Sequence, residues 1–392
     1  MNILYSCSEY PPFRNGGIGS STKIVAEEMA KRGHKIFVVG YYTDLTNKES
    51  EEVINGVHLL RFNLGYRRGR VRQNLFYGLN KLHLAGFFIQ RELDWFECKI
   101  DDLIIKKKID LLELTDYYGF NAYLTRLKYR HFSIPVVLRV HGSESFLLQH
   151  AGLNNRLALK NDYSHFLRSD WLCSVSQYSE NYIIKTFPSL SFKGKKIIYN
   201  PLETSFFKNN NPSMNKTILF IGKLVRTKGA YVLVEAFGRI HKDFPEWSLK
   251  MIGGGDVKEL QKSISLESKK YVSFLGFCDR KTIIDEIDKC AFACIPSFFE
   301  NFSMVPLEIM GRTRALIFTK QTSGREIIND GYDGYVVDPH DVNEVCAKIR
   351  IMIENVELRN KFAERGYRKI KECFSVDVIV DKLEKFYTNC II

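Results

Sequence analysis

Short apolar runs alternate with amphipathic segments along the first half of the 392-residue chain. The apolar runs occupy residues 2–8, 35–40, 111–114, 135–140 and 171–176. Apolar residues recur at helical spacing in the segments 22–34 and 97–108, which predicts amphipathic helices there. Strands that alternate with helices predict a parallel sheet that is covered by helices on both faces.

The same alternation restarts after a polar interruption at residues 208–217, which is typical of a linker. Beyond it, strands are predicted at 218–222, 248–253, 272–277, 291–297 and 315–319, and helices at 230–244 and 281–290. The pattern therefore predicts two doubly wound α/β domains that face an interdomain cleft. We place them at residues 1–199 and 200–372, and expect a C-terminal helix at 373–392 that packs back toward the first domain. In such sheets ligands bind beyond the carboxyl ends of the strands, so we expect the site in the cleft.

Length and composition agree with a soluble two-domain protein. A chain of 392 residues exceeds the size at which one core usually keeps growing. No run of 18 apolar residues occurs, and the first residues lack the basic and apolar regions of a signal peptide. The nine cysteines are scattered without zinc-ribbon spacing, which is typical of buried core residues in a reducing cytosol. We expect a cytoplasmic protein.

The formal net charge of +12 favours an anionic partner, but it does not choose among nucleic acids, lipid surfaces and phosphorylated ligands. The densest basic cluster comprises Arg67, Arg68, Arg70 and Arg72. It is either a solvated loop or a contact with an anionic membrane or a phosphate-bearing acceptor.

Basic residues follow the first predicted strand of the second domain, in the segment GKLVRTKG. Gly222, Lys223, Arg226 and Lys228 all lie on this short loop. Cations at the end of a strand can neutralise a diphosphate that departs as a leaving group. The alternative is an ordinary basic surface loop. The segment is not a Walker loop, because GxxxxGK[ST] is absent.

The stretch ENFSMVPLE carries glutamates at both ends of an almost wholly apolar run. Ser303 is a suitable N-cap for a helix, whose first N–H groups would then be unpaired and available to an anion. Glu300 would precede this helix and Glu308 would lie within it. Carboxylates accept hydrogen bonds from a vicinal diol, so the pair suits a ligand that contains sugar, phosphate and ribose. Alternatively, the acids merely favour a helix N-terminus.

Taken together, these segments resemble the GT-B glycosyltransferases of the retaining family 4, the glycosyl transferases group 1. The loop GKLVRTKG, the E-x7-E stretch ENFSMVPLE and the segment TSGREIINDGYDGYVVDPHD match the second domain of that family. In the first half, EYPPFRNGGIGSS and VLRVHGSES resemble its glycine loop and its His-Gly turn. The resemblance covers nearly the whole chain.

The resemblance implies a role for each matching residue. Lys223 and Lys228 would bind the donor diphosphate, Glu308 the ribose hydroxyls, and Glu300 the transferred sugar, with His141 beside that sugar. Backbone groups would complete the nucleotide-sugar site at Gly16, Gly17, Gly222, Phe277, Asn301, Phe302, Ser303 and Met304. His141 as an ordinary turn residue, and Gly16 and Gly17 as a tight turn, remain open alternatives.

Three positions depart from the family pattern. Lys223 stands where arginine is frequent, so a bidentate fork is replaced by a point charge. Ser303 stands where glycine is common, and the segment TSGRE is poorer in glycine than usual, which leaves Glu326 without an assigned role.

The resemblance implies retaining transfer of a hexose-type sugar from a nucleotide diphosphate sugar, with UDP ahead of GDP. The acceptor would be a hydroxyl of a glycan or lipid-linked glycan in surface polysaccharide or glycoconjugate assembly. The basic charge suits an acceptor at the inner membrane face. No D-x-D motif is present, so we expect no metal and no other cofactor. The glutamates are not expected to act as the acid and nucleophile of a glycosidase; the departing phosphate would deprotonate the acceptor.

Two other classes remain open. One is a GT-B sugar phosphorylase or sugar-nucleotide epimerase. The other is a non-enzymatic basic protein that binds a membrane or nucleic acid, which UDP or GDP would not stabilise thermally. Between residues 66 and 108 we expect most aromatic residues to pack helices rather than to bind sugar: Phe76, Tyr77, Phe87, Phe88, Trp95 and Phe96.

Overall fold

The computed structural model describes residues 1–12, 16–42, 49–63, 74–75, 78–79, 85–117, 131–153, 155–208 and 215–392. The chain forms two compact units. Unit 1 comprises Met1–Pro201 together with Ile379–Ile392, and unit 2 comprises Leu202–Val378. The first division thus lies close to the predicted boundary between residues 199 and 200.

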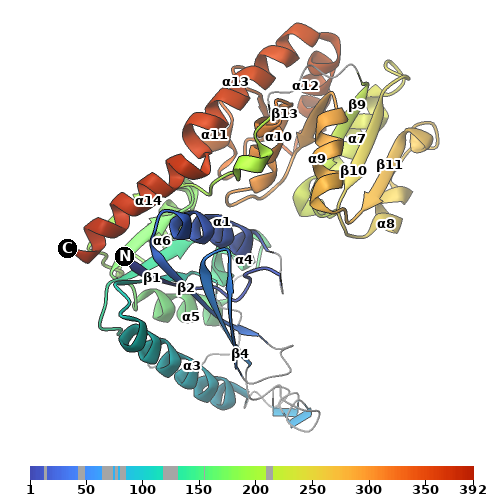
Figure 1. Cartoon of the computed structure of the whole chain (residues 1–392). Helices are drawn as coiled ribbons and strands as arrows, with labels where there is room; N and C mark the ends of the chain where they lie inside the picture. The colour runs from blue at the N-terminus through green and yellow to red at the C-terminus, as the bar shows by residue number, and fades with distance from the viewer. Residues whose placement is uncertain are drawn as a thin grey trace. The chain divides into compact units, whose positions relative to one another are not determined.

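Unit 1 is built on an eight-stranded sheet with the order β3-β4-β2-β1-β5-β6-β7-β8 (Figure 1). Its strands are β1 (Asn2–Ser6), β2 (Lys35–Tyr42), β3 (Glu49–Ile54), β4 (Val57–Asn63), β5 (Leu111–Thr115), β6 (Val136–Val140), β7 (Trp171–Ser174) and β8 (Gly194–Ile197). All neighbouring strands are parallel except β3 and β4, which pair antiparallel at one edge.

The sequence pattern missed the hairpin of β3 and β4. The acidic strand β3 is largely exposed, so it carries no apolar run. Asn55 and Gly56 between the strands have φ values of 50° and 82°, which is the backbone of a two-residue hairpin turn. An Asn-Gly pair is itself a hairpin signal and could have indicated this edge of the sheet.

The described helices of unit 1 are α1 (Gly17–Lys31), α3 (Ala85–Lys107), α4 (Glu144–His150), α5 (Arg156–Phe166) and α6 (Gln177–Thr186). The first helix begins earlier than the predicted segment 22–34, because the glycine loop itself provides its N-cap, Gly16, and its first turn. Trp95 and Phe96 of α3 both contact the ring of Phe62 edge-on, so they pack the helix as expected. Phe76 and Tyr77, and the side chains of Phe87 and Phe88, lie outside the described residues.

The last helix, α14 (Val376–Ile391), packs largely within unit 1. The hydroxyl of Tyr387 donates a hydrogen bond to the carboxylate of Glu113, which is buried in the central strand β5. The sequence prediction placed the start of this helix at residue 373, whereas it begins at Val376. The preceding helix extends to Phe374, and Ser375 adopts an extended conformation with φ −62° and ψ 151° between the two helices.

Unit 2 contains a six-stranded, fully parallel sheet with the order β11-β10-β9-β12-β13-β14. Its strands are β9 (Thr217–Ile221), β10 (Ser248–Ile252), β11 (Val272–Gly276), β12 (Phe292–Ile295), β13 (Ala315–Thr319) and β14 (Tyr335–Val337). The predicted parallel-sheet α/β fold is thus confirmed in both units, apart from the antiparallel edge of unit 1. The three-residue strand β14 was missed.

The described helices of unit 2 flank this sheet (Figure 1). They are η3 (Thr204–Phe206), η4 (Arg226–Lys228), α7 (Ala230–Ile240), α8 (Val257–Lys262), η5 (Lys269–Tyr271), α9 (Arg280–Lys289), α10 (Met304–Gly311), α11 (Gly324–Ile327), α12 (Val342–Glu354) and α13 (Val356–Phe374).

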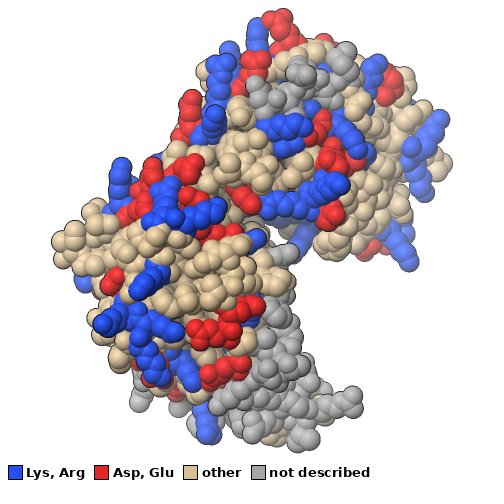
Figure 2. Space-filling view, viewed as in Figure 1, with Lys and Arg blue, Asp and Glu red and all other residues tan. Residues whose placement is uncertain are grey.

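Basic and acidic side chains are intermingled on the face of each unit that Figure 2 shows. The predicted arginine cluster at residues 67–72 lies outside the described residues. Among the described helices, none combines the length and the apolar character that a membrane crossing requires.

Candidate functional site

In unit 2 the stretch ENFSMVPLE connects β12 to α10, as the sequence predicts. Ser303 is the N-cap residue, with extended backbone at φ −78° and ψ 135°, but its hydroxyl makes no capping hydrogen bond to a described residue. The first N–H groups of any helix lack partners within the helix. The start of α10 therefore offers backbone donors, and the helix dipole adds partial positive charge there.

Glu300 is fixed from several directions. Its Oε1 accepts a hydrogen bond of 3.0 Å from the hydroxyl of Ser297, and its Oε2 lies 2.9 Å from Nζ of Lys228. Its backbone N–H donates to Oγ1 of Thr322 at 3.2 Å, and its carbonyl accepts from the hydroxyl of Ser323 at 3.2 Å. The residue exposes only 8% of its surface. Glu300 is therefore held rigidly beside a cation.

Lys228 reaches Glu300 because the loops after β9 and β12 are bonded to each other. The N–H of Phe298 donates to the carbonyl of Thr227 at 2.9 Å, and Nζ of Lys228 donates to the carbonyl of Phe299 at 3.4 Å. Gly229 follows with a left-handed φ of 75°, and a Cβ there would lie 2.0 Å from the carbonyl oxygen of Pro296. Glycine is required at this position for both reasons.

Lys223 lies on the same loop but is exposed. Two glycine-rich turns pack together beneath it: the N–H of Leu224 donates to the carbonyl of Gly254 at 2.8 Å, and a Cβ on Gly253 would lie 2.0 Å from the carbonyl oxygen of Gly222. The cations named from the sequence thus have different surroundings. Lys228 is paired with a carboxylate, whereas Lys223 is an exposed residue.

Glu308 lies in the second turn of α10 and is half-buried. Burial raises the pKa of its carboxyl from 4.5 to about 7, while the charge of Arg280 lowers it and that of Glu203 raises it. Arg280 is itself ion-paired with Glu203, and its guanidinium lies 4.6 Å from the ring centre of Phe206. The sequence analysis missed these neighbours of Glu308.

The remaining second-domain positions differ in exposure. Phe277 exposes 89% of its surface, and its ring covers Gly254, where a Cβ would lie 2.2 Å from the ring. Phe302 is buried, with its ring centre 6.0 Å from that of Phe374. Asn301 is 9% exposed and Met304 is the first residue of α10. The side chain of Phe302 therefore belongs to the core.

In unit 1, His141 follows β6 in a turn that a buried carboxylate holds. The N–H groups of His141 and Gly142 donate to the two carboxylate oxygens of Asp116 at 2.8 and 2.7 Å. A second buried carboxylate, Asp162, accepts from the N–H of Ser145 at 2.8 Å. Burial and the nearby charge of Arg139 lower the pKa of His141 to about 3, so its imidazole is neutral at neutral pH.

Asp116 is fully buried, and the sequence analysis did not identify it. Burial raises its carboxyl pKa to about 7, although the hydrogen bonds from His141 and Gly142 lower it. It directly follows β5, so its position at the carboxyl end of a predicted strand was the available signal.

The glycine loop of unit 1 contacts Glu9. A Cβ on Gly16 would lie 2.1 Å from Oε2 of Glu9, and one on Gly19 would lie 1.9 Å from its carbonyl oxygen. At Gly17, by contrast, a Cβ would have no described atom within 4 Å. The lack of a side chain at Gly16 thus has a structural reason within the loop, and Gly17 is the open position.

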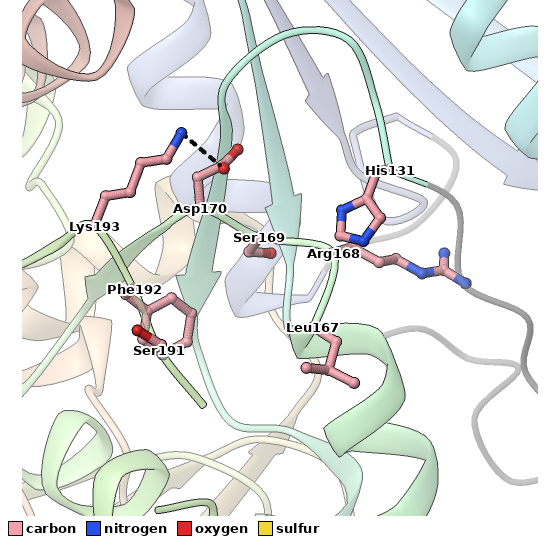
Figure 3. A pocket seen from close by; sticks show the side chains of 8 residues that line it. All are labelled: His131, Leu167, Arg168, Ser169, Asp170, Ser191, Phe192 and Lys193. Carbon is pink, nitrogen blue, oxygen red and sulfur yellow. Dashed lines mark ion pairs between the residues drawn. The ribbon is translucent and has the colours of Figure 1, made fainter. Parts of the chain in front are cut away.

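A cavity of about 280 Å³ is lined by none of these site residues; Figure 3 shows its lining. It lies where the chain enters β6, β7 and β8, at the opposite edge of the sheet from His141, and is lined by His131, Leu167, Arg168, Ser169, Asp170, Ser191, Phe192 and Lys193. Its polar groups connect strands: Asp170 accepts from the N–H of Val136 at 3.0 Å and pairs with Lys193 at 3.1 Å. Arg168 is ion-paired with Glu97.

Two family models together match most of the chain. The model of glycosyl transferases group 1 matches residues 202–369, and that of glycosyltransferase family 4 matches residues 15–206. The chain is 28% identical over 293 residues to an uncharacterized glycosyltransferase of Methanocaldococcus jannaschii, over 73% of this chain and 77% of the relative.

Solved structures share the fold over nearly the full length. Sucrose-phosphate synthase from Thermosynechococcus elongatus has a TM-score of 0.76 at 16% identity and covers 99% of this chain and 98% of its own. Anabaena HepE, in complex with UDP and glucose, has a TM-score of 0.71 at 17% identity and covers 99% of both chains. At these identities the likeness concerns the fold.

Proposed function

Because the chain belongs to the family 4 glycosyltransferases with the GT-B fold, we propose that it transfers a hexosyl group from a nucleotide diphosphate sugar to a hydroxyl of a glycan or lipid-linked glycan. The proposal extends to assembly of a surface polysaccharide or glycoconjugate. The observation that carries it is the Lys228–Glu300 ion pair, which places a cation beside a carboxylate in the segment that leads into α10 and its first backbone donors.

In this proposal unit 2 binds the donor. Lys228, Lys223 and the first N–H groups of α10 neutralise the diphosphate. The carboxylate of Glu308 accepts hydrogen bonds from the ribose diol, and Glu300 binds hydroxyls of the sugar. UDP is the preferred nucleotide, a choice that the complex of the structurally similar HepE with UDP and glucose supports.

Transfer proceeds with retention at the anomeric carbon. The bond from that carbon to the diphosphate oxygen breaks, and the acceptor oxygen attacks from the same face. The hydroxyl proton passes to the departing phosphate. Neutral His141 beside the donor sugar donates or accepts a hydrogen bond without adding a second positive charge to the site.

No metal ion or other cofactor takes part in the proposed reaction, because lysine and backbone donors supply the charge that a divalent cation would provide. Transfer measured with excess EDTA should match transfer without it. Loss of activity that Mg²⁺ or Mn²⁺ restores would contradict this part of the proposal.

The net charge of +12 suits an acceptor on an anionic membrane surface, so we also propose peripheral association with the inner face of the membrane. The protein should sediment with vesicles that contain anionic lipid at low salt and detach at high salt. Failure to sediment at low salt would remove the membrane association and leave the transferase proposal intact.

The primary test is ligand-dependent thermal stability. A donor site stabilises the folded protein by RT ln(1 + [L]/Kd), so UDP at 100 times its Kd should contribute about 2.7 kcal/mol. A screen of UDP and GDP sugars for donor hydrolysis then identifies the sugar. A protein that neither UDP nor GDP stabilises, and that hydrolyses none of these donors, is not the proposed transferase.

A further inference from the structure

A small cavity of about 40 Å³ lies in unit 1 at the carboxyl ends of β1, β2 and β5. It is lined by Cys7, Ser8, Glu9, Ile18, Tyr41, Thr115 and Tyr117. A single water requires roughly 10–15 Å³ of such space, so the cavity accommodates one hydroxyl or hydroxymethyl group with its nearest water, but not a sugar ring. Tyr117 is 38% exposed, and Ser8 and Glu9 are half-buried, so solvent reaches the cavity.

The polar lining is suited to a hydroxyl group. The hydroxyl of Ser8 accepts the N–H of Tyr41 at 3.2 Å, which leaves its own hydrogen available as a donor. Burial raises the pKa of the Cys7 thiol to about 11, so this group is neutral. Among the described lining residues Glu9 is the only acid and none is basic, and its carboxylate has no hydrogen-bond or ion-pair partner among the described residues.

The position of Glu9 is fixed by the glycine loop. Because Gly16 and Gly19 lack a Cβ, the Glu9 carboxylate and carbonyl pack directly against the start of α1. The positive end of the α1 dipole stabilises a carboxylate at this place. The start of α1 is therefore already adjacent to an anion that belongs to the chain.

Two residues that line the cavity also flank, in the sequence, the residue that holds the His141 turn. Thr115 and Tyr117 line the cavity, and Asp116 between them accepts both N–H groups of that turn. A group held in the cavity would lie on the same edge of the sheet as His141, which the proposed function places beside the donor sugar.

We propose that the cavity binds a hydroxyl or hydroxymethyl group of an uncharged acceptor sugar, and that the carboxylate of Glu9 excludes acceptors that carry a phosphoryl group at this position. The inference rests on the proposed function and specifies the acceptor class for it. Glu9 accepts a hydrogen bond from the sugar, and Ser8 donates one. A phosphoryl group would place like charges within contact distance, where their repulsion is large.

The test compares two probe classes on the full chain by saturation-transfer NMR titration. One class contains neutral hexoses, methyl hexosides and their disaccharides; the other contains the corresponding hexose 6-phosphates. The wild type should bind the best neutral probe at least about tenfold more tightly than its 6-phosphate. Glu9→Gln keeps the shape but removes the charge, so it should reduce this preference by about tenfold, chiefly through tighter binding of the phosphate.

Glu51→Gln is the matched control, since Glu51 is an exposed carboxylate of the edge strand β3, and it should leave the preference unchanged. Equal binding of both classes, binding of neither, or the same preference in Glu9→Gln overturns the inference. UDP stabilisation of the same samples separates the two proposals. If UDP or GDP stabilises the protein while the sugar preference is absent, only the inference about Glu9 fails. If neither nucleotide stabilises it, the proposed function fails.

Discussion

In unit 2 the ammonium group of Lys228 lies 2.9 Å from Oε2 of Glu300, with 29% and 10% of the two side chains exposed. The cation proposed to bind the donor diphosphate and the carboxylate proposed to bind the donor sugar thus form an ion pair with each other. A bound diphosphate competes with Glu300 for the same ammonium group, so each residue influences the task of the other.

This competition predicts opposite effects on nucleotide binding. Lys228→Met should weaken UDP binding by about tenfold or more, because a charge-assisted contact to phosphate is lost. Glu300→Gln should leave UDP affinity unchanged or tighten it by about twofold, because Lys228 is released from its partner. The same Glu300→Gln variant should lower transfer by about 100-fold, since a contact to the reacting sugar is lost. Calorimetric titration with UDP and an assay of sugar transfer measure the two quantities.

The exposed pair Lys242–Glu267, at 3.2 Å on the surface of the same unit, provides the control. Neutralising either member should change neither UDP affinity nor transfer, because exposed ion pairs contribute little. Weaker UDP binding in Glu300→Gln, by the same factor as in Lys228→Met, would show that the pair acts as one structural unit and would contradict the division of roles.

We predict that donor binding depends on pH through the ionisation of Glu308. Its carboxyl pKa is about 7 and its ionised form is the better acceptor for the ribose diol. UDP affinity of the wild type should therefore fall as the pH drops through 7. In Glu308→Gln the affinity should be weaker at pH 8, and the component that titrates near 7 should vanish. The difference between the two titration curves removes the phosphate ionisation of UDP, which is common to both.

The same shift has a consequence for stability. The folded pKa is raised above 4.5, so folding is favoured with the carboxyl protonated, and this contribution is fully present below pH 4.5. This contribution to the free energy of unfolding amounts to at most roughly 3 kcal/mol, and it is lost as the pH rises through about 7. Relative to Glu308→Gln, the wild type should thus lose free energy of unfolding between pH 4.5 and 7.5. Parallel stability profiles for the two proteins would contradict the raised pKa.

Local pattern predicted five of the six parallel strands of unit 2, β9 to β13, because each contains a short apolar run, whereas β14 has only three residues. It also placed the start of α10, because Ser303 and the apolar run after it form a local signal. The local sequence pattern could not identify the partners of Glu300. Thr322 and Ser323 belong to the loop after another strand and meet Glu300 only through the fold. In unit 1, Asp116 and His141 are 25 residues apart and meet for the same reason.

We predict that a substitution of Asp116 lowers the rate of transfer without changing nucleotide binding. Asp116→Asn keeps one acceptor oxygen but turns an amide group toward the second N–H of the His141 turn, which leaves that N–H unsatisfied. The turn should loosen and kcat should fall by about tenfold or more, because a lost buried hydrogen bond costs about 1–3 kcal/mol. UDP affinity should stay constant, since His141 is proposed to contact the sugar rather than the nucleotide.

Asp110→Asn is the matched control for that variant. Asp110 accepts the N–H of Asn2 at 2.7 Å, so it is also a carboxylate bonded to backbone, but at the opposite end of β5. It should reduce stability without a selective loss of kcat. An equal loss of kcat in both variants would mean that Asp116 acts only through the stability of unit 1.

Gly229 joins the two loops that hold Lys228 and Glu300, and a pair of glycine variants isolates its role. Gly229 and Gly331 have nearly the same φ, 75° and 72°, so an alanine at either costs about 1–2 kcal/mol of backbone strain. Only at Gly229 would the new Cβ meet another group, the carbonyl oxygen of Pro296 at 2.0 Å, whereas at Gly331 no described atom lies within 4 Å. Gly229→Ala should therefore displace the loop that begins at Pro296, lower the Tm more than Gly331→Ala does, and weaken UDP binding by about tenfold or more. Thermal unfolding and UDP titration of both variants measure this difference. If Gly229→Ala binds UDP as tightly as Gly331→Ala does, the contact between the two loops is not what positions Lys228 for the donor.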